Sequence, residues 1–135
     1  MRFPRWVFLG AGIWGVAVLA PLCFLVDITG RHYDAPASYP QFVYGFMGVA
    51  LAWQIVFVVI GSDPVRYRLL MIPAILEKCG FIVPAVLLFL QRRITGADAS
   101  AAIPDFILGV LFSIAFVRTP GGMGVASAAG GLPRA

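Results

Sequence analysis

The sequence predicts an all-α integral membrane protein, a four-helix bundle with both termini on the cytoplasmic side. Hydrophobic residues make up 61% of the 135 residues and charged residues only 12%, whereas about 45–50% of a soluble domain is apolar. The apolar residues also gather in four long stretches, and the basic residues are unevenly divided between the connections. A disordered chain is excluded, because such chains are poor in apolar residues.

The four predicted spans cover residues 6–26, 41–60, 65–90 and 100–117, in one domain of residues 1–118. About 20 apolar residues cross a bilayer core of ~30 Å. The stretches are apolar on all sides, unlike the alternating strands of a membrane barrel. The first could also belong to a signal peptide, but the apolar part of a signal peptide usually has about 7–15 residues. A retained helix is therefore favoured.

Capping signals place the starts of the later helices. A serine precedes a proline at residues 38–40 and again at 62–64, which is typical of a capped first turn. Asp98 or Ser100 is expected to cap the fourth helix. Asp105 would then lie about one turn inside that helix, where we expect an ion pair with the arginines of the preceding loop at the membrane interface.

The connections predict the orientation and limit the partners. One side of the bundle holds Arg2, Arg5, Arg66, Arg68, Arg118 and Arg134, and the other holds Arg31, Arg92 and Arg93. Basic loops stay in the cytoplasm, so both termini are expected there. Residues 119–135 are rich in Gly and Ala and predict a flexible tail. The scattered charges do not predict nucleic-acid binding, and Cys23 and Cys79 lack metal-ligand neighbours, so no metal or cofactor is expected.

Small residues that share one face of a helix predict close helix contacts, because helices in lipid associate where their backbones can approach. The candidates are Ala11, Gly12 and Gly15 in the first span, Gly45, Gly48 and Ala52 in the second, and Gly109 and Ser113 in the fourth. Together they favour a tight bundle within one chain.

Glu77 and Lys78 are the most unusual residues, because both lie inside the third span. An ionisable side chain at mid-membrane costs about 2.5–3.5 kcal/mol on insertion scales. At 1.5 Å per residue, Gln54, Trp14 and Ser113 reach a similar depth on the other helices. We therefore predict one polar layer, with Trp14, Gln54, Glu77 and Ser113 as candidate ligand-binding residues and Glu77 and Lys78 as candidate catalytic residues.

The layer is compatible with three roles. It could fix the helix register in an accessory, structural or small-ligand-binding protein, with Gln54 and Ser113 hydrogen-bonded to Glu77. It could carry protons or small solutes in a transporter subunit that acts as an oligomer. It could also use Glu77 as an acid or base in an enzyme for a lipophilic substrate. The non-enzymatic role is favoured, in the cell membrane, with the lipid bilayer and a homo-oligomer or larger membrane complex as partners.

Overall fold

The computed structural model describes residues 2–29 and 40–120, and every regular element in these ranges is helical. The elements are α1 (Arg2–Thr29), α2 (Pro40–Ser62), the 3₁₀ helix η1 (Arg68–Leu70), α3 (Met71–Leu90), α4 (Gly96–Ser100) and α5 (Ile103–Arg118). Four segments are long and apolar enough to span a membrane, with α4 and α5 counted together and η1 joined to α3. The all-helical class is confirmed. The predicted tail lies outside the described residues from position 121 onward.

The third span begins later than its capping signal predicts. Asp63 accepts a hydrogen bond from the Arg66 N–H at its side chain (3.2 Å) and one from the Tyr67 N–H at its carbonyl (3.1 Å). These bonds hold residues 64–67 in turns, and α3 starts only at Met71, after η1. The serine–proline signal at residues 62–64 therefore marks a tight turn between α2 and α3.

The fourth span begins earlier than predicted. Thr95 caps α4, because its hydroxyl accepts a hydrogen bond from the Asp98 N–H (3.2 Å) while the Asp98 carboxylate accepts one from the Thr95 N–H (3.1 Å). This reciprocal pair is a capping box. The helix is interrupted at residues 101–102 and resumes as α5. The cap is thus Thr95, and Asp98 is the third residue of α4. Asp105 therefore lies deeper in the span than expected.

Helix α3 ends in a Schellman motif that has arginine where glycine is usual. The Arg93 N–H donates to the Leu88 carbonyl (2.9 Å) and the Arg92 N–H donates to the Phe89 carbonyl (2.9 Å). This pattern needs a left-handed residue, and Arg92 has φ 55°. Side chains with a Cβ reach that conformation only at a cost.

Arg92→Gly should therefore stabilise the protein by about 0.5–1 kcal/mol, because glycine adopts the left-handed conformation without a steric penalty. Reversible unfolding in mixed micelles would measure the change. Arg93→Gly removes the same charge from the same loop at a position without a positive φ, and it should give no gain. Equal changes in stability for Arg92→Gly and Arg93→Gly would show that the gain comes from the lost charge and not from the backbone conformation.

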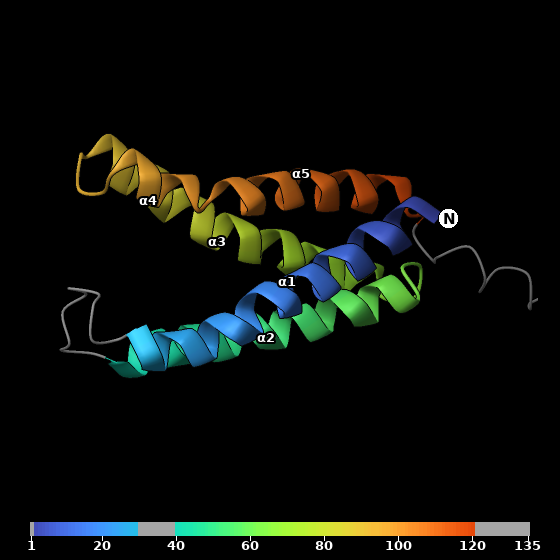
Figure 1. Ribbon diagram of the computed structural model, residues 1–135. Coiled ribbons are helices and arrows are strands. Elements are labelled where there is room, and N and C mark those ends of the chain that lie inside the picture. Colours follow the sequence, from blue (N-terminus) through green and yellow to red (C-terminus); the bar gives the residue numbers. More distant parts are fainter. Residues whose placement is uncertain (1, 30–39, 121–135) are drawn as a thin grey trace, which may run out of the picture.

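The spans form two antiparallel hairpins that meet at one end and diverge toward the other (Figure 1). Helix α1 packs mainly on α2, and α3 packs mainly on α5, whereas α2 and α3 hardly touch. The hairpins join around three buried phenylalanines: Phe8 of α1 stacks on Phe112 of α5 (4.2 Å between ring centroids), and Phe57 of α2 meets Phe112 edge-on (4.9 Å). This aromatic core closes the end of the molecule that contains the N-terminus.

Glycines allow the close approach of α1 to α2. A Cβ on Gly12 would lie 2.8 Å from the Gln54 carbonyl oxygen, and one on Gly61 would lie 2.8 Å from the Leu9 nitrogen. Gly12 was expected at a helix contact. Gly45 and Gly48 were also expected there, but a Cβ on either would meet nothing within 4 Å. The packing stripe of α2 is therefore shorter than its small residues suggest.

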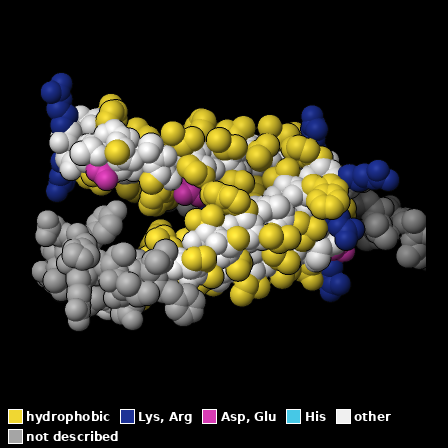
Figure 2. Space-filling view, in the orientation of Figure 1, with side chains coloured by type: hydrophobic (Ala, Val, Ile, Leu, Met, Phe, Trp, Pro, Cys, Tyr) yellow, Lys and Arg dark blue, Asp and Glu magenta, His cyan; other side chains and the backbone are white. Residues whose placement is uncertain are grey.

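A hydrophobic belt separates two basic ends of the molecule (Figure 2). The arginine end, which also holds the N-terminus, has Arg2, Arg5, Arg66, Arg68 and Arg118. There Arg68 donates to the Thr119 carbonyl (2.7 Å) and lies over the Phe116 ring at 4.1 Å, which ties the start of the third span to the end of α5. Between the ends, many large apolar side chains point outward, as the helix faces of a membrane protein do.

Candidate functional site

A crevice with a volume of about 430 Å³ opens between the two hairpins where they diverge. All four spans line it, and its walls are mainly apolar. The aromatic lining residues are Trp14 of α1, Phe46 and Trp53 of α2, and Phe81 of α3. Small-molecule sites in proteins usually occupy about 300–1,000 Å³, so the crevice has the size of a ligand site.

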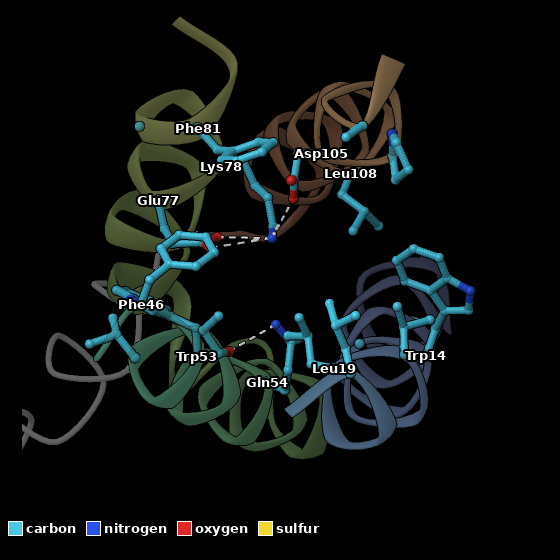
Figure 3. A pocket seen from close by; sticks show the side chains of 18 residues that line it. Trp14, Leu19, Phe46, Trp53, Gln54, Glu77, Lys78, Phe81, Asp105 and Leu108 are labelled. Atoms are coloured by element: carbon cyan, nitrogen blue, oxygen red, sulfur yellow. Dashed lines mark hydrogen bonds and ion pairs between the residues drawn. The ribbon is translucent and has the colours of Figure 1, made fainter. Parts of the chain in front are cut away.

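Three charged side chains from the second hairpin meet in this crevice (Figure 3). Lys78 Nζ lies 3.0 Å from Glu77 Oε2 and 2.7 Å from Asp105 Oδ1. It also donates a longer hydrogen bond of 3.4 Å to Glu77 Oε1. One ammonium therefore bridges two carboxylates, and we call these three residues the charged cluster.

The lysine of the charged cluster is buried where the two hairpins meet. Lys78 is only 5% exposed, and its ammonium lies 5.1 Å from the centre of the Phe57 ring in the aromatic core. A Cβ built on Gly109 would lie 3.6 Å from the Cβ of Lys78. Because Gly109 has no side chain, α5 can approach α3 closely beside Lys78. The cluster therefore lies on the side of the crevice next to the aromatic core.

Gln54 faces the charged cluster from α2 (Figure 3) and is only 4% exposed. Its amide nitrogen donates to the Ala50 carbonyl of its own helix (3.0 Å). The expected hydrogen bond to Glu77 is therefore not formed. The carboxamide lies directly against Gly15, where any Cβ would overlap it. Gly15 thus provides the space that the Gln54 side chain occupies beside the crevice.

The structure brings together four of the five predicted site residues, since Trp14, Gln54, Glu77 and Lys78 all line the crevice. Trp14 is half exposed (51%) and forms part of the outer wall. Ser113 does not join them, because it is exposed and donates to the Gly109 carbonyl of its own helix (2.8 Å).

Asp105 is the site residue that sequence reasoning placed elsewhere. The expected ion pair with the loop arginines is wrong, because the Asp105 carboxylate contacts Lys78 instead. One sequence signal would have indicated its depth. The Thr95–Asp98 pair begins the fourth span at Gly96, which puts Asp105 nine residues inside it. In an antiparallel hairpin, that depth brings Asp105 within about one turn of Lys78.

The chemistry of the site follows from its donors and acceptors. The charged cluster has two carboxylates and one ammonium, and so a formal charge of −1. Within the described part of the chain, no group of three His, Cys, Asp or Glu side chains is arranged to hold a metal ion. The site thus combines an aromatic hollow with excess hydrogen-bond acceptors.

Comparisons of the chain with protein-family models, with curated proteins and with solved structures find no match. The crevice and its side chains are therefore the features from which a function is inferred.

Proposed function

We propose that the protein is a multi-pass protein of the cell membrane that binds a small lipophilic molecule in the crevice between its hairpins. One observation carries this proposal: a crevice of ligand size has apolar walls and a charged cluster around the buried Lys78. Apolar pockets with a few convergent polar groups are the usual form of small-molecule sites. The apolar part of a ligand would lie along the walls, and its polar group would reach the cluster.

Binding suits the charged cluster better than proton-transfer catalysis. Lys78 already holds both carboxylates in ion pairs. Proton transfer to or from a substrate would have to break one of these pairs, whereas the polar group of a bound ligand can add a hydrogen bond and keep both. A charged cluster that only fixed the helix register would not need an open crevice beside it. The role of Lys78 and Asp105 in this proposal is to fix the position and charge of the polar end of the site.

We also propose that both termini lie in the cytoplasm. Among the described residues, the arginine end has five basic side chains, whereas the opposite end has Arg92 and Arg93. Basic residues close to the spans favour the cytoplasmic side. In this orientation the crevice widens toward the outer half of the bilayer, and the exposed helix faces contact lipid chains.

Filling the crevice should abolish binding. Gly80 lines the crevice, and a Cβ there would meet nothing within 4 Å, so Gly80→Leu is expected to fold and to project into the hollow. Trp14 and Trp53 report occupancy when Trp6 is replaced by phenylalanine, since Trp6 does not line the crevice. A nitroxide-labelled long-chain alcohol should quench their fluorescence saturably, and Gly80→Leu should weaken its binding at least about tenfold, because overpacking costs about 1–3 kcal/mol.

Gly48→Leu is the matched control, because it adds the same side chain at an open helical glycine that does not line the crevice. It should leave the quenching curve unchanged. A quenching curve without saturation, identical in all three proteins, would mean that the probe only partitions into the micelle and would refute the proposed function.

A further inference from the structure

The charged cluster has more negative than positive charge in a part of the molecule that is buried between apolar helices. Glu77 and Asp105 both contact Lys78, at 3.0 Å and 2.7 Å. Among the residues that the structure describes, no other Lys, Arg, Asp or Glu lines the crevice. One carboxylate charge is therefore uncompensated within the described residues, and an uncompensated charge inside a membrane is costly.

The cluster also has fewer hydrogen-bond donors than its acceptors can use. The lysine ammonium is already engaged by Glu77, by Asp105 and by the face of the Phe57 ring. Glu77 Oε2 is buried and accepts no hydrogen bond from any described residue, although the ammonium lies within ion-pair distance. The amide nitrogen of Gln54 donates to the Ala50 carbonyl of its own helix. A buried acceptor without a donor is destabilising unless another molecule supplies one.

The walls of the crevice suit a cation. Trp14, Trp53, Phe46 and Phe81 line it, and the rings of Phe46 and Phe81 lie 6.2 Å apart across α2 and α3. Aromatic faces attract ammonium groups through their quadrupoles, most strongly in sites that exclude water. Aromatic walls and excess carboxylate charge therefore favour the same kind of ligand.

We infer that the ligand of this crevice is a lipophilic amine in its ammonium form. The ammonium would donate to Glu77 Oε2 and to the Asp105 carboxylate, neutralise the cluster, and leave the hydrocarbon part along the aromatic walls. This inference rests on the proposed function, because it specifies the ligand class of the same crevice. Fatty acids and other anions are excluded from the site by its charge.

Displacement of the nitroxide-labelled alcohol from the Trp6→Phe protein tests the inference. Dodecylamine and dodecanol have the same chain and differ in the head group. Dodecylamine should displace the label at a concentration at least about tenfold lower than dodecanol, because hydrogen bonds to charged groups are the stronger ones. Dodecanoate should displace it no better than dodecanol does.

Asp105→Asn keeps the shape of the side chain and leaves Lys78 with a single carboxylate partner. It should reduce the preference for dodecylamine over dodecanol, both measured on the same variant, to less than about threefold. Asp63→Asn is the matched control, because Asp63 is an exposed acid in the α2–α3 turn at the arginine end. It should keep the full amine preference.

The outcomes separate the two proposals. If dodecanol and dodecylamine displace the label equally, and Gly80→Leu still prevents binding, the crevice is a ligand site but the amine inference fails. An amine preference that survives Asp105→Asn also overturns the inference, because the preference would then arise outside the cluster. If no amphiphile displaces the label, both proposals fail.

Discussion

Lys78→Met should destabilise the protein by about 3–5 kcal/mol, because removing one partner of a buried ion pair leaves the other charges uncompensated. The effect has two sources, since Lys78 is the shared partner of both Glu77 and Asp105. The free energy of unfolding can be followed by circular dichroism during titration of mixed micelles with a denaturing detergent.

A rescue experiment identifies the cause of that loss. Adding Glu77→Gln and Asp105→Asn to Lys78→Met removes all three charges and should restore most of the stability, because the penalty comes from unpaired carboxylates. Arg93→Met is the control for losing a basic residue, since Arg93 is exposed, and it should change stability by less than about 0.5 kcal/mol. A loss below 1 kcal/mol for Lys78→Met alone would contradict a sheltered cluster.

Gly12→Ala should destabilise the α1–α2 hairpin by about 1–3 kcal/mol, the usual cost of adding a methyl group to a packed interface. The new Cβ would lie 2.8 Å from the Gln54 carbonyl oxygen and 3.2 Å from the Val58 nitrogen. Both are backbone atoms, so the helices can accommodate the methyl group only by moving apart. Unfolding in mixed micelles measures the loss.

Gly10→Ala provides the comparison within the same helix. A Cβ at Gly10 meets nothing within 4 Å, and alanine is the better helix former. Gly10→Ala should therefore be neutral or slightly stabilising. A similar loss for both variants would show that the helix itself, and not its contact with α2, responds to the substitution.

The sequence predicts the helical fold well and the site only in part, for a physical reason. Length and apolarity determine how many segments can span a bilayer, and counting residues from a helix end gives depth. Depth alone brings Gln54 and Glu77 to one level. It does not give the direction in which a side chain points. Ser113 has the expected depth, but its side chain is exposed, whereas that of the neighbouring Phe112 is buried.

Asp105 was misplaced by an error in the start of a helix. With a fourth span that begins at residue 100, Asp105 is close to the water interface. With the span beginning at Gly96, after the Thr95 cap, Asp105 is deep enough to meet Lys78. Four residues of helix are about 6 Å at 1.5 Å per residue. Such an error is about a fifth of the ~30 Å hydrocarbon thickness, enough to bring a residue expected at the interface to the level of Lys78.

The division into two hairpins has a consequence for biosynthesis. Glu77, Lys78 and Asp105 all belong to the C-terminal hairpin, so that the opposite charges can meet as soon as its two helices pair, before any contact with the N-terminal hairpin. In the membrane location proposed above, such a unit would enter the bilayer as a partly neutralised pair of helices, which would lower the energy of inserting three ionisable groups. Assembly of the complete protein would then be the docking of two inserted halves.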